Sequence, residues 1–244
     1  MRVRPEEIIL EKYSIDEKNN FFLLCGNEDT FIDKINELII NKLKQNGYQE
    51  VIKINENVDL ESTLISNTAS LFSEKKIFVL NNQTKLDLDT IKKIDLTDKV
   101  IIIIDKKIKN SSKIKTYVET HPNHVCITCY KLSRESKKGI LEYYLKLNKI
   151  EIERDAYWYF VDNSDDRYKL FENEITKIIN FDSKKIVLSD LISLISKNSN
   201  EDIDKLFFTI LSPQKEIIYT SLANINSSGD SFFLVQRIKY YLNL

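Results

Sequence analysis

Short apolar runs alternate with longer amphipathic stretches through the first half of the chain. Five runs have the length and β-branched content of strands: 21–25, 51–54, 76–80, 100–104 and 125–130. Between the first two runs, apolar residues recur every three to four positions from Phe31 to Leu43 and mark one face of a long helix. Weaker helical patterns span 60–71 and 111–120. Strands that alternate with helices are typical of βαβ units, so the pattern predicts a mostly parallel sheet with helices on both faces.

The run 100–104 is apolar at every position, which is typical of a central strand buried on both faces. Asp105 ends this run. In an active ATPase an aspartate at such a position can help to hold magnesium, but without a phosphate-binding loop we interpret it as an ordinary strand-end residue.

After residue 131 the strand-like runs give way to helical patterns. Ser133 is a suitable N-cap for a helix that runs to 149, and further helices are predicted at 154–162, 166–179 and 188–196. Another helical region starts at 201. The pattern therefore predicts an α/β domain over 1–131, a small all-helical domain over 132–198 and a partial, all-helical third region over 199–244.

A phosphate-binding loop is missing where the first strand runs into a turn and a helix. Such a P-loop needs a second glycine and a lysine five and six positions after the first glycine. After Gly26 these positions hold Phe31 and Ile32. Glu28 and Asp29 suit the positive end of the helix dipole but would repel a phosphate. The sequence thus predicts a nucleotide-binding frame used without nucleotide, with no cofactor and no catalytic residues.

Both histidines of the chain lie close to two of its three cysteines. His121, His124, Cys126 and Cys129 are residue types that bind zinc. A strand over 125–130, however, sends Cys126 and Cys129 to opposite faces, and no glycine is present to make a chelating turn. We therefore expect a core strand with small buried thiols and no metal site. Three cysteines cannot all pair, which favours a reducing compartment such as the cytoplasm.

The charges of the chain nearly cancel, with 36 Lys and Arg against 37 Asp and Glu. Contact with nucleic acid must then come from a local basic cluster. Lys106, Lys107 and Lys109 follow the central strand, and Arg134 and Lys137 begin the helical domain. Either cluster could face a phosphate backbone or could be a solvated surface. No apolar run is long enough to span a membrane.

Several short motifs in a fixed order resemble one family. These are FLLCGNE at 22–28, ASLF at 69–72 ahead of the strand 76–80, LKLNKIEI at 145–152 followed by Asp155 and Ala156, and DDRYKLFENE at 165–174. In order and spacing they resemble the delta subunit of the bacterial DNA polymerase III clamp loader. The resemblance implies a degenerate AAA+ module, made of the α/β domain and a helical lid, followed by a partial helical collar.

The resemblance also implies a role without catalysis in the polymerase (nucleotidyltransferase) complex. Delta subunits bind and open the ring-shaped sliding clamp through a hydrophobic pair that falls here on Leu71 and Phe72, next to Ser70. The implied partners are the clamp, the other loader subunits and, indirectly or weakly, primed DNA, while ATP acts on the motor subunits.

Other interpretations remain open at the sequence level. Leu71 and Phe72 could simply complete the core. The chain could be a stand-alone regulator that binds the clamp without loading it, since the predicted collar is short. It could also be an ATPase with a divergent loop, although Glu28 and Asp29 argue against bound nucleotide.

Overall fold

The computed structural model describes residues 1–16, 18–54, 75–81, 88–94, 96–108, 112–195 and 239. Its main body is a six-stranded parallel sheet with the order β1-β6-β2-β5-β4-β3. The strands are β1 (Arg2–Val3), β2 (Phe21–Gly26), β3 (Glu50–Ile54), β4 (Lys76–Asn81), β5 (Lys99–Asp105) and β6 (His124–Cys129). The parallel α/β class predicted from the sequence is confirmed.

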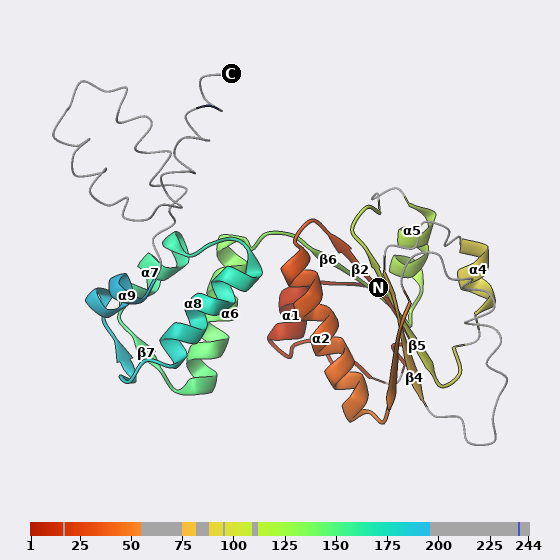
Figure 1. Cartoon of the computed structure of the whole chain (residues 1–244), viewed down its shortest axis with the longest axis horizontal. Coiled ribbons are helices and arrows are strands. Elements are labelled where there is room, and N and C mark those ends of the chain that lie inside the picture. The colour runs from red at the N-terminus through yellow and green to blue at the C-terminus, as the bar shows by residue number, and fades with distance from the viewer. Residues whose placement is uncertain are drawn as a thin grey trace.

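Helices cover both faces of this sheet (Figure 1). On one face lie α1 (Pro5–Ile9) and α2 (Asp29–Gln45), and on the other lie α4 (Leu88–Lys93) and α5 (Lys113–Thr120). All five strands predicted from the sequence are present, with each end within one residue of its expected position. The sequence pattern missed β1, α1 and α4.

The central strands separate two hydrophobic cores. In β5, Val100, Ile102 and Ile104 pack into the core beneath α2, which we call the first core. Ile101 and Ile103 pack into the second core, on the side of α4 and α5. Because β5 is buried on both faces, its apolar run has no polar alternation.

The helical domain is built from α6 (Arg134–Asn148), α7 (Arg154–Asn163), α8 (Tyr168–Ile179) and α9 (Leu188–Leu194). Ser133 caps α6 as predicted, because its hydroxyl accepts the backbone N–H of Ser136 at 3.1 Å. The domain is not wholly helical, since β7 (Glu151–Ile152) and β8 (Lys185–Ile186) form a short parallel pair. Two residues per strand are too few to leave a pattern in the sequence.

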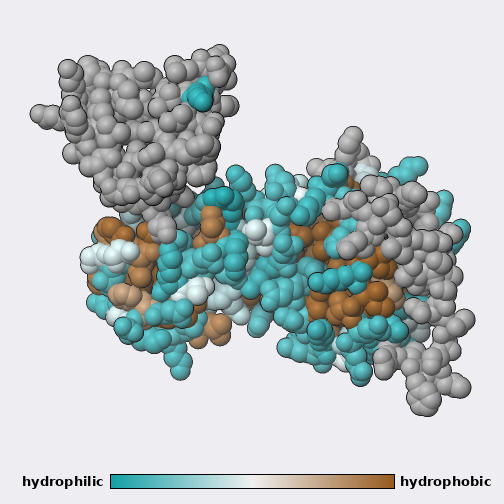
Figure 2. Space-filling view, in the orientation of Figure 1, coloured by the Kyte–Doolittle hydropathy of each residue, from teal (hydrophilic) through white to brown (hydrophobic). Residues whose placement is uncertain are grey.

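The first core continues from the sheet into the helical domain, which we call the lid. Leu24 and Phe31 of the α/β domain belong to the same cluster as Phe160, Tyr168 and Phe171 of the lid. Hydrophobic surface gathers on each body, and hydrophilic residues separate the two patches (Figure 2). The packing therefore joins the two bodies beneath a polar surface.

The predicted third region, 199–244, lies outside the described residues except for Lys239. The division of the chain into 1–131, 132–198 and 199–244 stays a prediction. Among the helices that the structure describes, none has both the length and the apolar character needed to cross a bilayer.

Candidate functional site

The turn after β2 occupies the position of a phosphate-binding loop, and its backbone faces the protein itself. Gly26 has φ +127°, and a Cβ at this position would overlap the carbonyl oxygen of Cys129 at the end of β6. The same oxygen accepts the N–H groups of Asn27 at 3.1 Å and of Glu28 at 3.3 Å. Two of the amides that would face a phosphate in a P-loop are thus already bonded to a carbonyl.

Glu28 fills the anion-binding place at the start of α2. Its side chain is buried, with 5% of the residue exposed, and its carboxylate accepts the N–H of Phe31. The hydroxyl of Thr30 donates to both carboxylate oxygens, each at 3.0 Å. An anion is favoured at a helix N-terminus, and here the chain supplies its own carboxylate. A phosphate in this place would meet a negative charge, as the sequence predicts.

Two further carboxylates near this turn have partners within the chain. Asp29 pairs with Lys106 at 2.9 Å, which joins the start of α2 to the segment after β5. Asp105 accepts the backbone N–H of Lys107 at 2.9 Å and so stabilises the turn that ends β5. This observation fits the interpretation of Asp105 as a strand-end residue.

The lid covers the same corner of the α/β domain through α8. The ring of Phe31 stacks on that of Tyr168 with a centroid distance of 4.7 Å and an interplanar angle of 4°. The backbone N–H of Lys169 donates to the hydroxyl of Thr30 at 3.1 Å, and Lys34 pairs with Glu172 at 2.7 Å. The first two turns of α2 and of α8 are therefore in direct contact.

The pKa of Glu172 reflects this contact. Burial alone would raise the pKa, but hydrogen bonds from Lys34 and Lys169 outweigh burial and hold the pKa of Glu172 below its ordinary value. For Lys34, burial lowers the pKa, and the bond to Glu172 outweighs it, so the pKa is raised overall. Both groups are charged at neutral pH.

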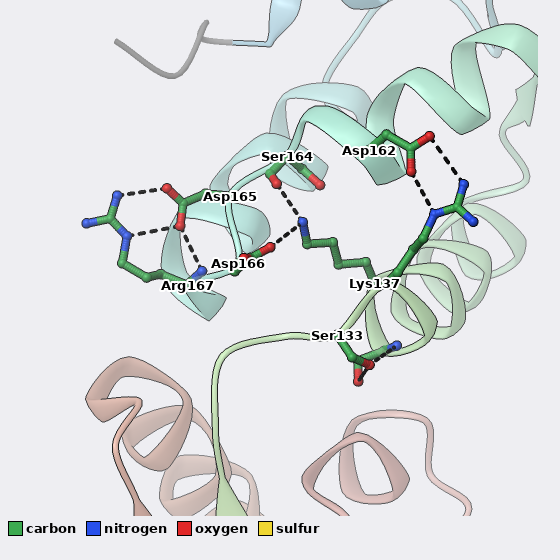
Figure 3. A network of polar contacts seen from close by, with 9 residues as sticks. Ser133, Lys137, Asp162, Ser164, Asp165, Asp166 and Arg167 are labelled. Carbon is green, nitrogen blue, oxygen red and sulfur yellow. Dashed lines mark hydrogen bonds and ion pairs between the residues drawn. The ribbon is translucent and has the colours of Figure 1, made fainter. Parts of the chain in front are cut away.

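The candidate DNA-binding residues at the start of the lid take part in a polar network within it (Figure 3). The ammonium of Lys137 donates to the carbonyl of Ser164 and pairs with Asp166, both at 2.6 Å, and its side chain is only 6% exposed. Arg134 binds the two oxygens of Asp162 at 2.7 and 3.2 Å. Lys137 thus fixes α6 to the loop before α8, and its charge is turned into the lid.

The predicted clamp-binding residues cannot be placed. Ser70, Leu71 and Phe72, which fall between β3 and β4, lie outside the described residues. Lys109, which follows β5, lies outside them too. Lys106 and Lys107 are exposed in the turn that follows β5.

The histidines and cysteines lie where the strand prediction puts them. Cys126 belongs to the second core and Cys129 to the first, so they face opposite sides of the sheet. The rings of His121 and His124 stack at 3.7 Å. Within the part of the chain that the structure describes, three or more His, Cys, Asp or Glu side chains do not gather in a metal-binding arrangement.

The parallel sheet and the helical lid that packs on it form an α/β module without the glycine and lysine of a P-loop after Gly26. The fold is similar to that of the DNA clamp loader delta protein (YqeN) of Bacillus subtilis, with a TM-score of 0.62 and 14% sequence identity over 88% of this chain and 69% of that chain. The chain therefore has a clamp-loader-delta-like fold.

Two other solved structures match with lower scores. The Holliday junction branch migration motor RuvB of Thermotoga maritima gives a TM-score of 0.44 with 11% identity over 89% of this chain and 78% of that chain. Domain III of the replication initiation protein DnaA, also of Thermotoga maritima, gives a TM-score of 0.39 with 12% identity over 78% of this chain and 95% of that chain. No family model and no curated protein sequence matches the chain.

Proposed function

We propose that this protein acts as a clamp-loader delta subunit, which binds the ring-shaped sliding clamp and favours its open state during DNA replication. The observation that carries the proposal is the delta-like fold over 88% of the chain. Three of the sequence motifs that resemble the delta family, 22–28, 145–152 and 165–174, lie within the described part of this fold. The implied partners are the clamp, the other loader subunits and primed DNA.

The role needs no catalytic residue in this subunit. The carboxylate of Glu28 and the carbonyl of Cys129 take the hydrogen bonds that a bound phosphate would need. An ATPase with a divergent loop is disfavoured for the same reason. In a complex of this kind, the energy of ATP hydrolysis comes from other subunits.

The proposed clamp-binding site is the pair Leu71 and Phe72, with Ser70 beside it. An apolar side chain of this size contributes about 1.5–3 kcal/mol when it becomes fully buried. To shift the ratio of open to closed rings from 1:99 to 99:1, the subunit must bind the open state more tightly than the closed state by about 5.5 kcal/mol. Two such anchors with supporting contacts reach this range if they engage the open ring better than the closed one.

Contact with DNA is proposed for the turn after β5, at Lys106, Lys107 and Lys109. Lys106 pairs with Asp29, but both side chains are well exposed, and such a surface ion pair contributes little. Arg134 and Lys137 have partners inside the lid, and we do not include them. The three cysteines are free and buried, which fits a reducing compartment, and we place the protein in the cytoplasm.

The test is binding to the sliding clamp of the same organism by surface plasmon resonance. We expect Leu71→Ala/Phe72→Ala to weaken binding at least about 100-fold, because two buried anchors are lost. The matched control is Leu147→Ala/Ile192→Ala, which removes two exposed apolar side chains of the lid and should leave binding unchanged. A wild-type protein that does not bind the clamp would contradict the proposal.

A second measurement separates a loader subunit from a stand-alone clamp-binding regulator. Clamp preloaded on nicked circular DNA should leave the circle faster when this protein is added, because an opened ring can escape. If the protein binds the clamp but does not speed the loss of the clamp from the DNA circle, a stand-alone regulator is the better interpretation.

A further inference from the structure

We propose that side chains of α2 and α8 form a latch between the α/β domain and the lid, which holds the lid in one orientation without a ligand. We call Thr30, Phe31, Lys34, Tyr168, Lys169 and Glu172 the latch. The inference rests only on contacts within this chain and does not depend on clamp binding.

The apolar part of the latch is the stack of Phe31 on Tyr168. Both residues are 1% exposed, and both belong to the first core, which passes from the sheet into the lid. Their rings are almost parallel, with an angle of 4°. Any movement of the lid that separates the two rings would expose two large aromatic faces to water.

The polar part of the latch is a cap that one domain supplies to a helix of the other. The first backbone N–H groups of a helix have no partner within the helix. Within the described residues, the N-cap residue Arg167 makes no capping hydrogen bond with its side chain. The hydroxyl of Thr30 accepts the N–H of Lys169 instead, at 3.1 Å.

Glu28 sets the direction of this hydroxyl. The proton of Thr30 is donated to the carboxylate of Glu28, so a lone pair of the oxygen is left for Lys169. The same carboxylate accepts the N–H of Phe31 and caps α2. One buried carboxylate therefore orders the N-terminal turns of two helices in two domains.

An ion pair closes the latch one turn further along both helices. Lys34 and Glu172 lie 2.7 Å apart and are largely buried, with side-chain exposures of 22% and 16%. Lys169 also binds Glu172, at 3.1 Å. Because the pair is partly buried, salt screens its attraction less than that of a surface pair.

A second contact lies beside the latch, so the lid is held at two points. The hydroxyl of Ser136 in α6 donates to the carboxylate of Glu6 in α1. In Figure 1, α1 and α2 lie side by side and face the lid helices α6 and α8. Two contacts on neighbouring pairs of helices resist both separation and rotation of the lid.

The test measures the distance between spin labels by pulsed electron paramagnetic resonance. Lys42→Cys in α2 and Lys146→Cys in α6 place the labels at exposed positions, while the three native cysteines are buried and need not be replaced. We expect a single narrow distance distribution for the otherwise unchanged protein. Several distances in this protein would overturn the proposal.

The decisive variant is Lys34→Glu, which puts two carboxylates opposite one another. We expect its distance distribution to become at least twice as broad. The charge swap Lys34→Glu/Glu172→Lys should narrow it in part, because it restores the pair but sets a second lysine beside Lys169. The matched control is Lys44→Glu, which makes the same change at an exposed position of the same helix. The latch would be contradicted if the distance distribution of Lys34→Glu were as narrow as that of the control. It would also be contradicted if the distribution of the charge swap stayed as broad as that of Lys34→Glu.

Thr30→Val gives a second test if Lys34→Glu does not fold. Valine keeps the shape of threonine but cannot accept the N–H of Lys169. Hydrogen exchange of the Lys169 amide should then become at least tenfold faster, while the amide of Tyr157, bonded to Glu153 within the lid, should keep its rate. Unchanged exchange at Lys169 would show that the cap does not hold the lid.

Discussion

At the residue scale, two glycines of this chain lie in opposite surroundings. Gly26 has φ +127° and lies against the backbone of Cys129, whereas Gly139 lies inside α6, where the nearest atom to an added Cβ is the Leu10 side chain at 3.7 Å. The first position excludes a side chain, and the second accepts one.

We expect Gly26→Ala and Gly139→Ala to change the free energy of unfolding in opposite directions. Gly26→Ala should lower it by about 3 kcal/mol or more, because a clash with backbone adds to the strain of a positive φ. Gly139→Ala should raise it by about 0.5–1 kcal/mol, since alanine is the better helix former. Urea unfolding followed by circular dichroism measures both, and a loss of stability for Gly139→Ala would be inconsistent with this packing.

The residues of the turn after β2 show which features of the site could be predicted from the sequence and which could not. Phe31 and Ile32 stand at the glycine and lysine positions of a P-loop, so the sequence alone predicts that the residues which bind phosphate are missing. The bond from Thr30 to Lys169 could not be predicted, because it joins residues 139 positions apart. A hydroxyl near a helix start leaves no signal that points to a second helix.

At the scale of elements, the N-terminus, α5 and β6 meet around His124. The ammonium of Met1 donates to the carbonyls of Val118, His121 and His124 at 2.9, 3.2 and 2.7 Å. Burial, then the neighbouring His121 and the ammonium of Met1, lower the pKa of His124 to about 4. His124 is therefore neutral in the folded protein at pH 5, where an exposed histidine would carry a proton.

This shift in the pKa of His124 predicts a loss of stability in acid. The pKa of His124 in the folded protein lies below the ordinary value of 6.5, so in acid the unfolded chain binds a proton more readily than the folded one. The contribution of neutral His124 to stability is therefore complete above about pH 6.5. It is lost as the pH falls toward 4. Between pH 7.5 and pH 5, this residue should reduce the free energy of unfolding by about 2 kcal/mol.

The measurement compares the wild type with His124→Phe, which keeps an aromatic ring in place of the imidazole. Urea unfolding at pH 5 and at pH 7.5 should show a smaller pH dependence in the variant by that amount. His121→Gln keeps His124 and should retain most of the dependence. Equal pH dependence in the wild type and His124→Phe would mean that His124 titrates normally.

The elements themselves were predicted unevenly, for a physical reason. Long buried strands and long amphipathic helices leave a repeated pattern, so β5 and α2 were predicted within two residues. The five-residue helix α1 and the two-residue strands β7 and β8 are too short to repeat a pattern. Pairing and packing with distant segments, rather than local preference, determine where they form.

At the scale of the whole molecule, the first core joins the sheet to the lid. A core that passes without interruption between two bodies predicts that they unfold together. Trp158, the only tryptophan of the chain, lies in α7 and reports on the lid, while circular dichroism reports on all the helices. The two signals should give the same urea midpoint.

Lys137→Met tests this coupling. The variant keeps the length of the side chain but leaves the buried carbonyl of Ser164 without the ammonium donor, at a cost of about 1–3 kcal/mol. Both signals should shift to the same lower midpoint. A shift in the fluorescence of Trp158 alone would mean that the lid unfolds separately. Lys146→Met, which makes the same change at an exposed position of α6, is the matched control.

The sequence by itself determined the strands, the main helices and the absence of phosphate-binding residues, because these depend on local periodicity and on residue type at fixed spacing. The tertiary structure alone decided what takes the place of the phosphate. It brought Glu28, the carbonyl of Cys129 and the start of α8 to one corner of the sheet. Such contacts depend on how distant elements pack, and the spacing of residues along the chain does not record them.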